Sequence, residues 1–222
     1  MTTHQTAWLY EVLGQRGLIV GSSGNVSTRV ADGMMITPSG GAPDEAVSLV
    51  HAGMDGSVLS GHGTPSSEWA LHAAVYGVCP DARYIVHTHA DACTALACLG
   101  LPLPAFHYMV LQFGGDDVRC APYVTFGTQA LADVAARAIE GRSACLLANH
   151  GMIVCAPTAQ AALTRTVLLE TLCRQYLLAR AAGEPRLLTA AEMADARERF
   201  KTYGPSGTTP RASVSSLATP NG

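Results

Sequence analysis

The pattern of apolar and polar positions predicts short strands mixed with amphipathic helices. Buried strands appear as short, β-branched or continuously apolar runs between turns. Such runs cover residues 24–30, 34–37, 48–51, 57–59, 84–89 and, hinged at Gly151, 144–155. Helices are expected where apolar residues recur with a helical period. They cover residues 6–16, 66–78, 91–99, 128–139, 157–182 and 190–200.

The order of these elements indicates one α/β domain. Strands and helices intermix without regular alternation, so we expect a central mixed, mainly antiparallel β-sheet covered by helices on both faces. The chain has 222 residues, 48% of them hydrophobic, which is enough to bury a sizeable core. We assign residues 1–204 to this domain. Residues 205–222, rich in Ser, Thr, Pro and Gly, are expected to form a disordered C-terminal tail.

Charge and composition exclude several classes of partner. The formal net charge is -3 and no run of basic residues is present, so we expect no nucleic-acid partner. No signal-peptide pattern opens the chain and no apolar run approaches the length of a membrane span, so we expect no membrane partner. The 7 cysteines include no Cys-x-x-Cys pair, which favours free thiols in a reducing compartment. We therefore expect a cytoplasmic protein.

Histidines provide the strongest chemical signal. His87 and His89 end a predicted strand, where residues i and i+2 point to the same face and can bind one ion. His150 also lies at a predicted strand end. Three neutral imidazoles leave an open position on a zinc-like metal, as in a catalytic site, whereas the alternative is that these histidines are structural. The remaining candidates lack a partner at ligand spacing and are expected to be surface or helix-packing residues: His51, His62 and His72.

Glu68 and the small polar residues before it suggest a second component of this site. Glu68 follows Ser66-Ser67 in the first turn of a predicted helix, so it could act as a general acid or base or simply complement the helix dipole. The free N–H groups and hydroxyls of such a turn suit phosphate. Loops at residues 22–25 and 37–40 could bring further donors, although each alone is more often a plain turn.

Two common mechanisms are not indicated. The only lysine is Lys201, near the end of the predicted domain, which is a poor position for the buried lysine that imine catalysis requires. The chain contains neither Gly-x-Gly-x-x-Gly nor a Walker-type Gly-Lys-Ser/Thr, so nucleotide binding is not indicated.

A succession of motifs resembles the class II aldolase/adducin family over roughly residues 5–204. The motifs are Gly24-Asn25-Val26-Ser27, Ile36-Thr37-Pro38-Ser39-Gly40, Pro65-Ser66-Ser67-Glu68-Trp69, His87-Thr88-His89-Ala90, His107-Tyr108-Met109, Ala121-Pro122-Tyr123-x-Thr125-Phe126-Gly127-Thr128, Asn149-His150-Gly151 and Phe200-Lys201-Thr202-Tyr203-Gly204. Within the family, the pattern is most similar to the enzymes that act on L-fuculose 1-phosphate.

The resemblance implies a role for each matching position. The family's zinc ligands fall on His87, His89 and His150, with one Zn²⁺ per chain, and its catalytic carboxylate falls on Glu68. Its phosphate-binding residues fall on Gly24, Asn25, Ser39, Gly40, Ser66 and Ser67. Its two catalytic tyrosines fall on Tyr108 and Tyr203. It further implies a homo-oligomer, a cyclic tetramer whose active sites lie between neighbouring chains.

The implied reaction is the reversible, zinc-dependent cleavage of a ketose 1-phosphate into dihydroxyacetone phosphate and an aldehyde. The ketose would be of the L-fuculose, 5-deoxyribulose or 5-methylthioribulose 1-phosphate type. The segments Leu111-Gln112-Phe113 and Pro205-Ser206-Gly207 depart from the fuculose pattern where the aldehyde half should bind, so the sugar stays open. Within the same fold, a methylthioribulose-1-phosphate dehydratase and a phosphopentose epimerase are alternatives. A non-enzymatic, adducin-like scaffold is a third.

Overall fold

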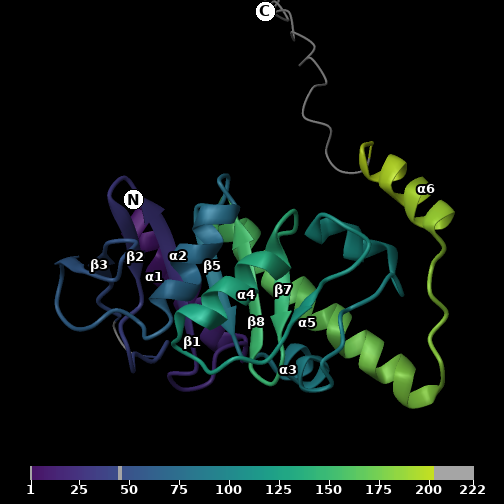
Figure 1. Ribbon diagram of the computed structural model, residues 1–222, viewed down its shortest axis with the longest axis horizontal. Coiled ribbons are helices and arrows are strands. Elements are labelled where there is room, and N and C mark those ends of the chain that lie inside the picture. The colour runs from purple at the N-terminus through teal and green to yellow at the C-terminus, as the bar shows by residue number, and fades with distance from the viewer. Residues whose placement is uncertain (1, 45–46, 203–222) are drawn as a thin grey trace, which may run out of the picture.

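The computed structural model describes residues 2–44 and 47–202, in which eight strands form one sheet (Figure 1). The strands are β1 (Gly24–Val30), β2 (Gly33–Ile36), β3 (Val50–Ala52), β4 (Val58–Ser60), β5 (Tyr84–Thr88), β6 (Cys120–Ala121), β7 (Ala144–Leu147) and β8 (Gly151–Ala156). Their spatial order is β4-β3-β2-β1-β5-β8-β7-β6. Only the β6–β7 pair is parallel among the pairs that the structure describes, so the predicted mixed, mainly antiparallel sheet is confirmed.

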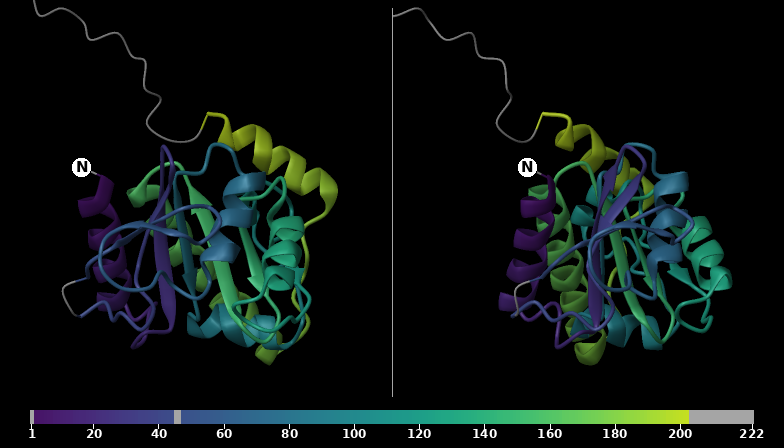
Figure 2. Two further views of the ribbon diagram at one scale, coloured as in Figure 1. Left: turned by 60° about the vertical axis from the view of Figure 1, so that its left-hand side comes forward. Right: turned by 90° about the vertical axis from the view of Figure 1, so that its left-hand side faces the viewer.

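Helices cover both faces of the sheet, as Figure 2 shows. One face carries α1 (Thr2–Gln15), α3 (Asp91–Cys98) and α5 (Ala159–Ala182), and the other carries α2 (Trp69–Val78) and α4 (Gln129–Ile139). The 3-10 helix η1 (Tyr108–Phe113) contacts α6 (Ala190–Phe200). The expected arrangement of helices on both faces is therefore confirmed.

The central strands are apolar on both sides because both sides are covered. Along β7, Leu146 packs with the cluster under α3 and α5, while Cys145 packs with the cluster under α2 and α4. Along β8, Met152 packs with the cluster under α3 and α5, and Ile153 packs with the cluster under α2 and α4. These runs therefore appear continuously hydrophobic in the sequence, unlike the alternating pattern of a half-exposed strand.

Some predicted boundaries are wrong. The helix expected from residue 66 begins at Trp69, because the Ser66 hydroxyl accepts a hydrogen bond from the Glu68 N–H (3.3 Å) and the segment forms a turn. The short elements β6 and η1 were not predicted, since they are only 2 and 6 residues long and lack a periodic pattern. Tyr203 and the tail at residues 205–222 lie outside the described residues. No helix among those described combines the length and apolar character that a membrane crossing needs.

Candidate metal and phosphate site

His87 lies at the centre of the sheet, on β5 between β1 and β8. Its register partners are Asn25 and Ile153, and its side chain is fully buried. The ring Nδ1 donates a hydrogen bond to the Met152 carbonyl, 2.9 Å away. This bond selects the tautomer in which Nε2 carries a free lone pair, which is how a second-shell carbonyl prepares a metal-binding histidine.

The three predicted histidines converge on one point. Their ring centroids lie 4.8 to 4.9 Å apart in all three pairings, with interplanar angles of 68° to 73°. The Nε2 atoms of His87 and His89 are 3.1 Å apart. Nitrogens about 2.0–2.1 Å from a tetrahedral metal lie about 3.3 Å from each other. The rings are therefore arranged as ligands of one ion.

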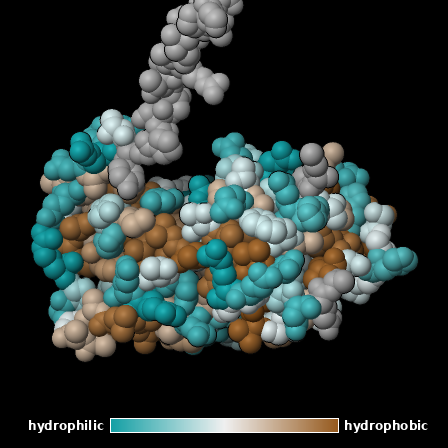
Figure 3. All heavy atoms as spheres, turned by 180° about the vertical axis from the view of Figure 1, so that it is seen from behind, coloured by the Kyte–Doolittle hydropathy of each residue, from teal (hydrophilic) through white to brown (hydrophobic). Residues whose placement is uncertain are grey.

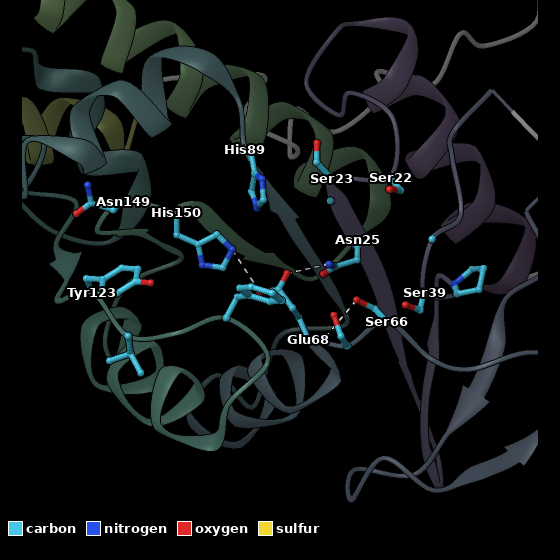
Figure 4. Close-up of a pocket in the computed structure, with 16 residues that line it drawn as sticks. Ser22, Ser23, Asn25, Ser39, Ser66, Glu68, His89, Tyr123, Asn149 and His150 are labelled. Atoms are coloured by element: carbon cyan, nitrogen blue, oxygen red, sulfur yellow. Dashed lines mark hydrogen bonds and ion pairs between the residues drawn. The ribbon is translucent and has the colours of Figure 1, made fainter.

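Glu68, the residue directly before α2, completes the cluster. Its Oε2 lies 3.0 Å from His87 Nε2, and its Oε1 lies 3.3 Å from His150 Nε2. Asn25 Nδ2 donates a hydrogen bond to Oε2 at 3.1 Å (Figure 4). One ligand atom from each of Glu68 and the three histidines falls within 4.8 Å of every other. This donor set suits zinc or a similar divalent cation.

The electrostatics of the cluster favour positive charge at its centre. Burial of the Glu68 carboxyl raises its pKa, but His87, His150 and the Asn25 amide outweigh burial and hold that pKa well below its usual value. Burial lowers the pKa of His87, whereas the Glu68 carboxylate and the Met152 carbonyl raise it above the ordinary value. A metal cation at the centre would supply this positive charge and use one ligand atom from each of the four side chains.

The other two imidazoles are kept neutral. Burial, followed by the nearby His87, lowers the pKa of His150 to about 4 and also lowers that of His89. Neutral imidazole is the form that binds metal. The pair is therefore ready to act as ligands at neutral pH.

A tight turn between β7 and β8 presents His150. Asn149 adopts a left-handed conformation with φ 53°, which Asn tolerates better than most residues. Gly151 allows β8 to approach the segment that carries His89, because a Cβ at Gly151 would lie 2.4 Å from the Thr88 carbonyl oxygen and 3.0 Å from the His89 ring. Any larger residue at 151 would push His89 out of position.

Glu170, on α5, anchors the segment that follows His89. Its buried carboxylate accepts hydrogen bonds from the N–H groups of Ala92 (2.9 Å) and Cys93 (3.0 Å), the first turn of α3. That helix has no side-chain cap of its own, so Glu170 supplies one from another element. Sequence reasoning missed this residue, because a single Glu in a long helix carries no sign of its partners.

A pocket of about 530 Å³ opens beside the cluster (Figure 4). All six predicted phosphate-binding residues line it, namely Gly24, Asn25, Ser39, Gly40, Ser66 and Ser67. Ser22 and Ser23, from the loop at residues 22–25 that was expected to bring further donors, also line it. The pocket lining further includes residues that were not singled out from the sequence as site residues, namely Tyr123, Val124, Phe126 and Asn149. No Lys or Arg is among the described residues that line this pocket, so an anion there must be held by N–H and hydroxyl groups.

Two backbone contacts assemble the donor loops of the pocket. Ser39 N–H donates to the Thr64 carbonyl at 2.9 Å, and Ser66 N–H donates to the Thr37 carbonyl at 3.1 Å. The loop at residues 37–40 is thereby joined to the turn before α2. At Gly40 the chain turns with φ 74°, a conformation that favours glycine.

The two predicted tyrosines are not brought to this pocket by the described residues. Tyr108, on η1, is 49% exposed, and its ring lies 5.8 Å from that of Phe200 at the surface between η1 and α6. Tyr203 lies outside the described residues. Within one chain, Tyr108 therefore does not line the pocket beside the histidines.

The model of one protein family matches most of the chain. The Class II Aldolase and Adducin N-terminal domain model covers residues 4–177. This range includes the three histidines, Glu68 and both donor loops.

Individual relatives agree in length and fold. The chain is 47% identical over 190 residues to the 5-methylthioribulose-1-phosphate/5-deoxyribulose-1-phosphate aldolase of Rhodospirillum rubrum, covering 85% of this chain and 86% of the relative. It is 44% identical over 191 residues to the L-fuculose phosphate aldolase of Escherichia coli, covering 85% and 88%. A solved L-fuculose 1-phosphate aldolase superposes with a TM-score of 0.83 at 38% identity, covering 90% of this chain and 96% of that one.

We predict about one divalent cation per chain, because one set of four ligand atoms converges on one point. The His89→Ala variant should lose most of this metal, since a ligand is removed. His51→Ala is the matched control, because His51 lies on β3 and binds Asp32 away from the cluster. Metal analysis of the purified proteins measures both. Equal metal contents in the wild type and His89→Ala would contradict the assigned site.

We predict that Glu170→Ala lowers the free energy of unfolding by about 2–3 kcal/mol, because two buried N–H groups lose a charged acceptor. Urea denaturation measures this loss. Glu198→Ala, which removes an exposed carboxylate paired with Lys201, is the control and should change stability by less than about 0.5 kcal/mol. Equal effects of the two variants would show that Glu170 does not cap α3.

Proposed function

This chain belongs to the class II aldolase and adducin family, and we propose on that premise that it reversibly cleaves a ketose 1-phosphate into dihydroxyacetone phosphate and an aldehyde. The family predicted from the sequence motifs is confirmed by these relatives. One observation supports the reaction most directly: three imidazoles and a carboxylate converge at the edge of a pocket lined by phosphate-type donors.

The chain's own residues divide the work of such a cleavage. A divalent cation bound by His87, His89 and His150 would supply a Lewis acid that stabilises the negative charge left beside the carbonyl group. The loops with Ser39 and Ser66 would bind the phosphate and so orient the donor half of the sugar.

Glu68 is suited to move the proton at the carbon that carries this charge. Its Oε2 accepts a hydrogen bond from Asn25, whereas its buried Oε1 accepts none among the described residues and lies 3.3 Å from His150 Nε2. The low pKa of this carboxyl keeps it ionised, so Oε1 can take a proton from carbon in the condensation direction and return it after cleavage. We assign Oε1 as the proton carrier.

The alternative of imine catalysis is disfavoured by geometry. The only lysine of the chain, Lys201, is exposed and paired with Glu198 at 2.7 Å. It does not line the pocket beside the histidines. A lysine that forms a Schiff base would need burial there to lower its pKa.

Three functions remain as alternatives to the proposed aldolase reaction. A methylthioribulose-1-phosphate dehydratase or a phosphopentose epimerase could use the same metal, but neither would release an aldehyde from a ketose 1-phosphate. An adducin-like scaffold would need neither the buried carboxylate nor three converging imidazoles. The physiological aldehyde could carry a methyl or a methylthio group, because relatives named for both types of substrate are similar to this chain.

We further propose zinc as the metal, a cytoplasmic location and a cyclic tetramer. A tetramer is supported by the surface opposite the view of Figure 1, where apolar side chains gather across the middle (Figure 3). It is also supported by Tyr108, which lies exposed and away from the pocket of its own chain. In a ring, Tyr108 and Tyr203 of one chain would reach the metal and Glu68 of the next. Tyr108 would there exchange the proton of the hydroxyl that becomes the aldehyde.

A panel of ketose 1-phosphates tests the proposed reaction. With L-fuculose, 5-deoxyribulose and 5-methylthioribulose 1-phosphates, we predict release of dihydroxyacetone phosphate, measured by coupled reduction, and loss of activity on chelation. The unphosphorylated sugars should react poorly, because the loop donors would lack their anion. Consumption of a substrate with loss of water and without an aldehyde would favour the dehydratase instead.

We predict that Glu68→Gln lowers kcat by on the order of 10²-fold or more while the protein stays folded, because the proton carrier is lost. Steady-state kinetics and thermal unfolding measure the two effects. Asp32→Asn, which changes an exposed carboxylate bound to His51, is the control. Glu68→Gln activity within threefold of the control would assign Glu68 to helix-dipole complementation alone.

Mixed oligomers test the shared site. Inactive Glu68→Gln and Tyr108→Phe chains, denatured and refolded together, should regenerate about a quarter of intact sites under random mixing in a ring. Neither variant refolded alone should recover. If mass analysis confirms mixed tetramers that are no more active than the separate variants, Glu68 and Tyr108 do not meet across an interface.

A further inference from the structure

His72 is a buried polar residue that the site described above does not use. It lies on α2, one helical turn after Glu68, and has no solvent exposure. Its Nε2 lies 2.5 Å from Asn25 Oδ1, and its Nδ1 lies 2.7 Å from Ser27 Oγ. Both ring nitrogens are therefore engaged by residues of β1.

The chemistry of these partners fixes the direction of each hydrogen bond. Asn25 uses its amide Nδ2 to donate to Glu68, so the atom that faces His72 is the carbonyl oxygen, which can only accept. His72 must therefore carry its proton on Nε2. Its Nδ1 then accepts from the Ser27 hydroxyl, which itself lies 2.9 Å from the Tyr76 hydroxyl. A one-directional series of hydrogen bonds leads from Ser27 through His72 and Asn25 to the Glu68 carboxylate, and the Tyr76 hydroxyl beside Ser27 donates to the Arg83 carbonyl at 3.3 Å.

This series of hydrogen bonds decides which end of the Asn25 amide faces Glu68. Without a donor at Oδ1, the amide could rotate by half a turn and present its oxygen to the carboxylate, where two acceptors repel each other. With His72 Nε2–H donating to Oδ1, only the observed orientation of the Asn25 amide forms hydrogen bonds with both His72 and Glu68. A neutral imidazole is sufficient for this task, and burial, followed by the nearby His87, lowers the pKa of His72 to about 3.

We propose that His72 is a positioning residue that locks the Asn25 amide and, through it, the orientation of the Glu68 carboxylate. This inference rests on the proposed function, in which Glu68 Oε2 stays hydrogen-bonded to Asn25 while Glu68 Oε1 moves the proton. It also gives Asn25 a second task besides lining the phosphate pocket. His72 does not line the pocket, and its ring nitrogens bond to Asn25 and Ser27 and not to the three converging imidazoles.

Two substitutions of His72 separate its hydrogen bond to Asn25 from its packing in the core. Gln places an amide N–H near the position of the ring Nε2 and can still donate to Asn25, whereas Asn reaches only the position of Nδ1. We expect His72→Asn to lower kcat by about 10- to 100-fold, as is typical for the loss of a second-shell partner. KM for the ketose 1-phosphate should stay within about twofold, since the serine donors of the phosphate site, Ser39, Ser66 and Ser67, are unchanged. His72→Gln should recover most of kcat.

Thr166→Val is the control for loss of a buried hydrogen bond elsewhere. Thr166 is fully buried on α5 and donates to the Ala162 carbonyl within its own helix. The Thr166→Val variant should unfold at a lower temperature and keep the wild-type kcat, as measured by thermal unfolding and steady-state kinetics. Equal kcat values for His72→Asn and the wild type, or equal losses in His72→Asn and His72→Gln, would overturn the proposal. If His72→Asn does not fold, loss of kcat in a folded His72→Gln protein would overturn it.

A second measurement needs no substrate. Nitrogen NMR of histidine-labelled wild-type protein, assigned by the signal that disappears in His72→Gln, reports which ring nitrogen carries the proton. We expect a neutral ring protonated at Nε2, and a proton on Nδ1 would overturn the hydrogen-bond chain. If no ketose 1-phosphate is cleaved while the Nε2 tautomer is found, the proposed function fails and the hydrogen-bond chain stands. The two failures are therefore distinguishable.

Discussion

The buried carboxylate of Glu68 is the constraint on which the rest of the site depends. An ionised carboxylate away from water is costly unless cations and hydrogen bonds compensate it. Here the compensation comes from His87, His150 and the Asn25 amide, and these partners leave a centre of lone pairs that favours a cation. The metal site and the low pKa of the carboxyl are consequences of this one arrangement, whereas burial and the nearby His87 keep His89 and His150 neutral.

The sheet supplies the precision that this arrangement needs. His87 is held between β1 and β8, so its position is set by hydrogen-bonded neighbours on both sides. The same β1 carries Asn25 toward the pocket and Ser27 toward α2. Glu68, at the start of α2, is thus supported both by the strand and by its own helix.

The sequence predicted the local parts of this structure and missed the long-range ones. The i, i+2 spacing of His87 and His89 correctly predicted that both rings meet, although β5 ends at Thr88 and His89 is the first residue after the strand. His72 was expected to be a surface or helix-packing residue, and it is buried on α2. Its hydrogen bonds to β1 depend on tertiary contacts across 45 and 47 residues, which no local pattern reveals. Glu170 was missed for the same reason. The start of α2 was misplaced because Ser66 belongs to a turn where the first turn of the helix was expected.

X-ray absorption at the metal edge of the purified protein tests the central claim most directly. The account predicts a shell of nitrogen and oxygen ligands at about 2.0–2.2 Å, with the outer-shell signature of three imidazoles. Seven cysteines offer an alternative, since all are free thiols in this structure. A shell with sulfur at about 2.3 Å, or one without imidazole, would contradict the account.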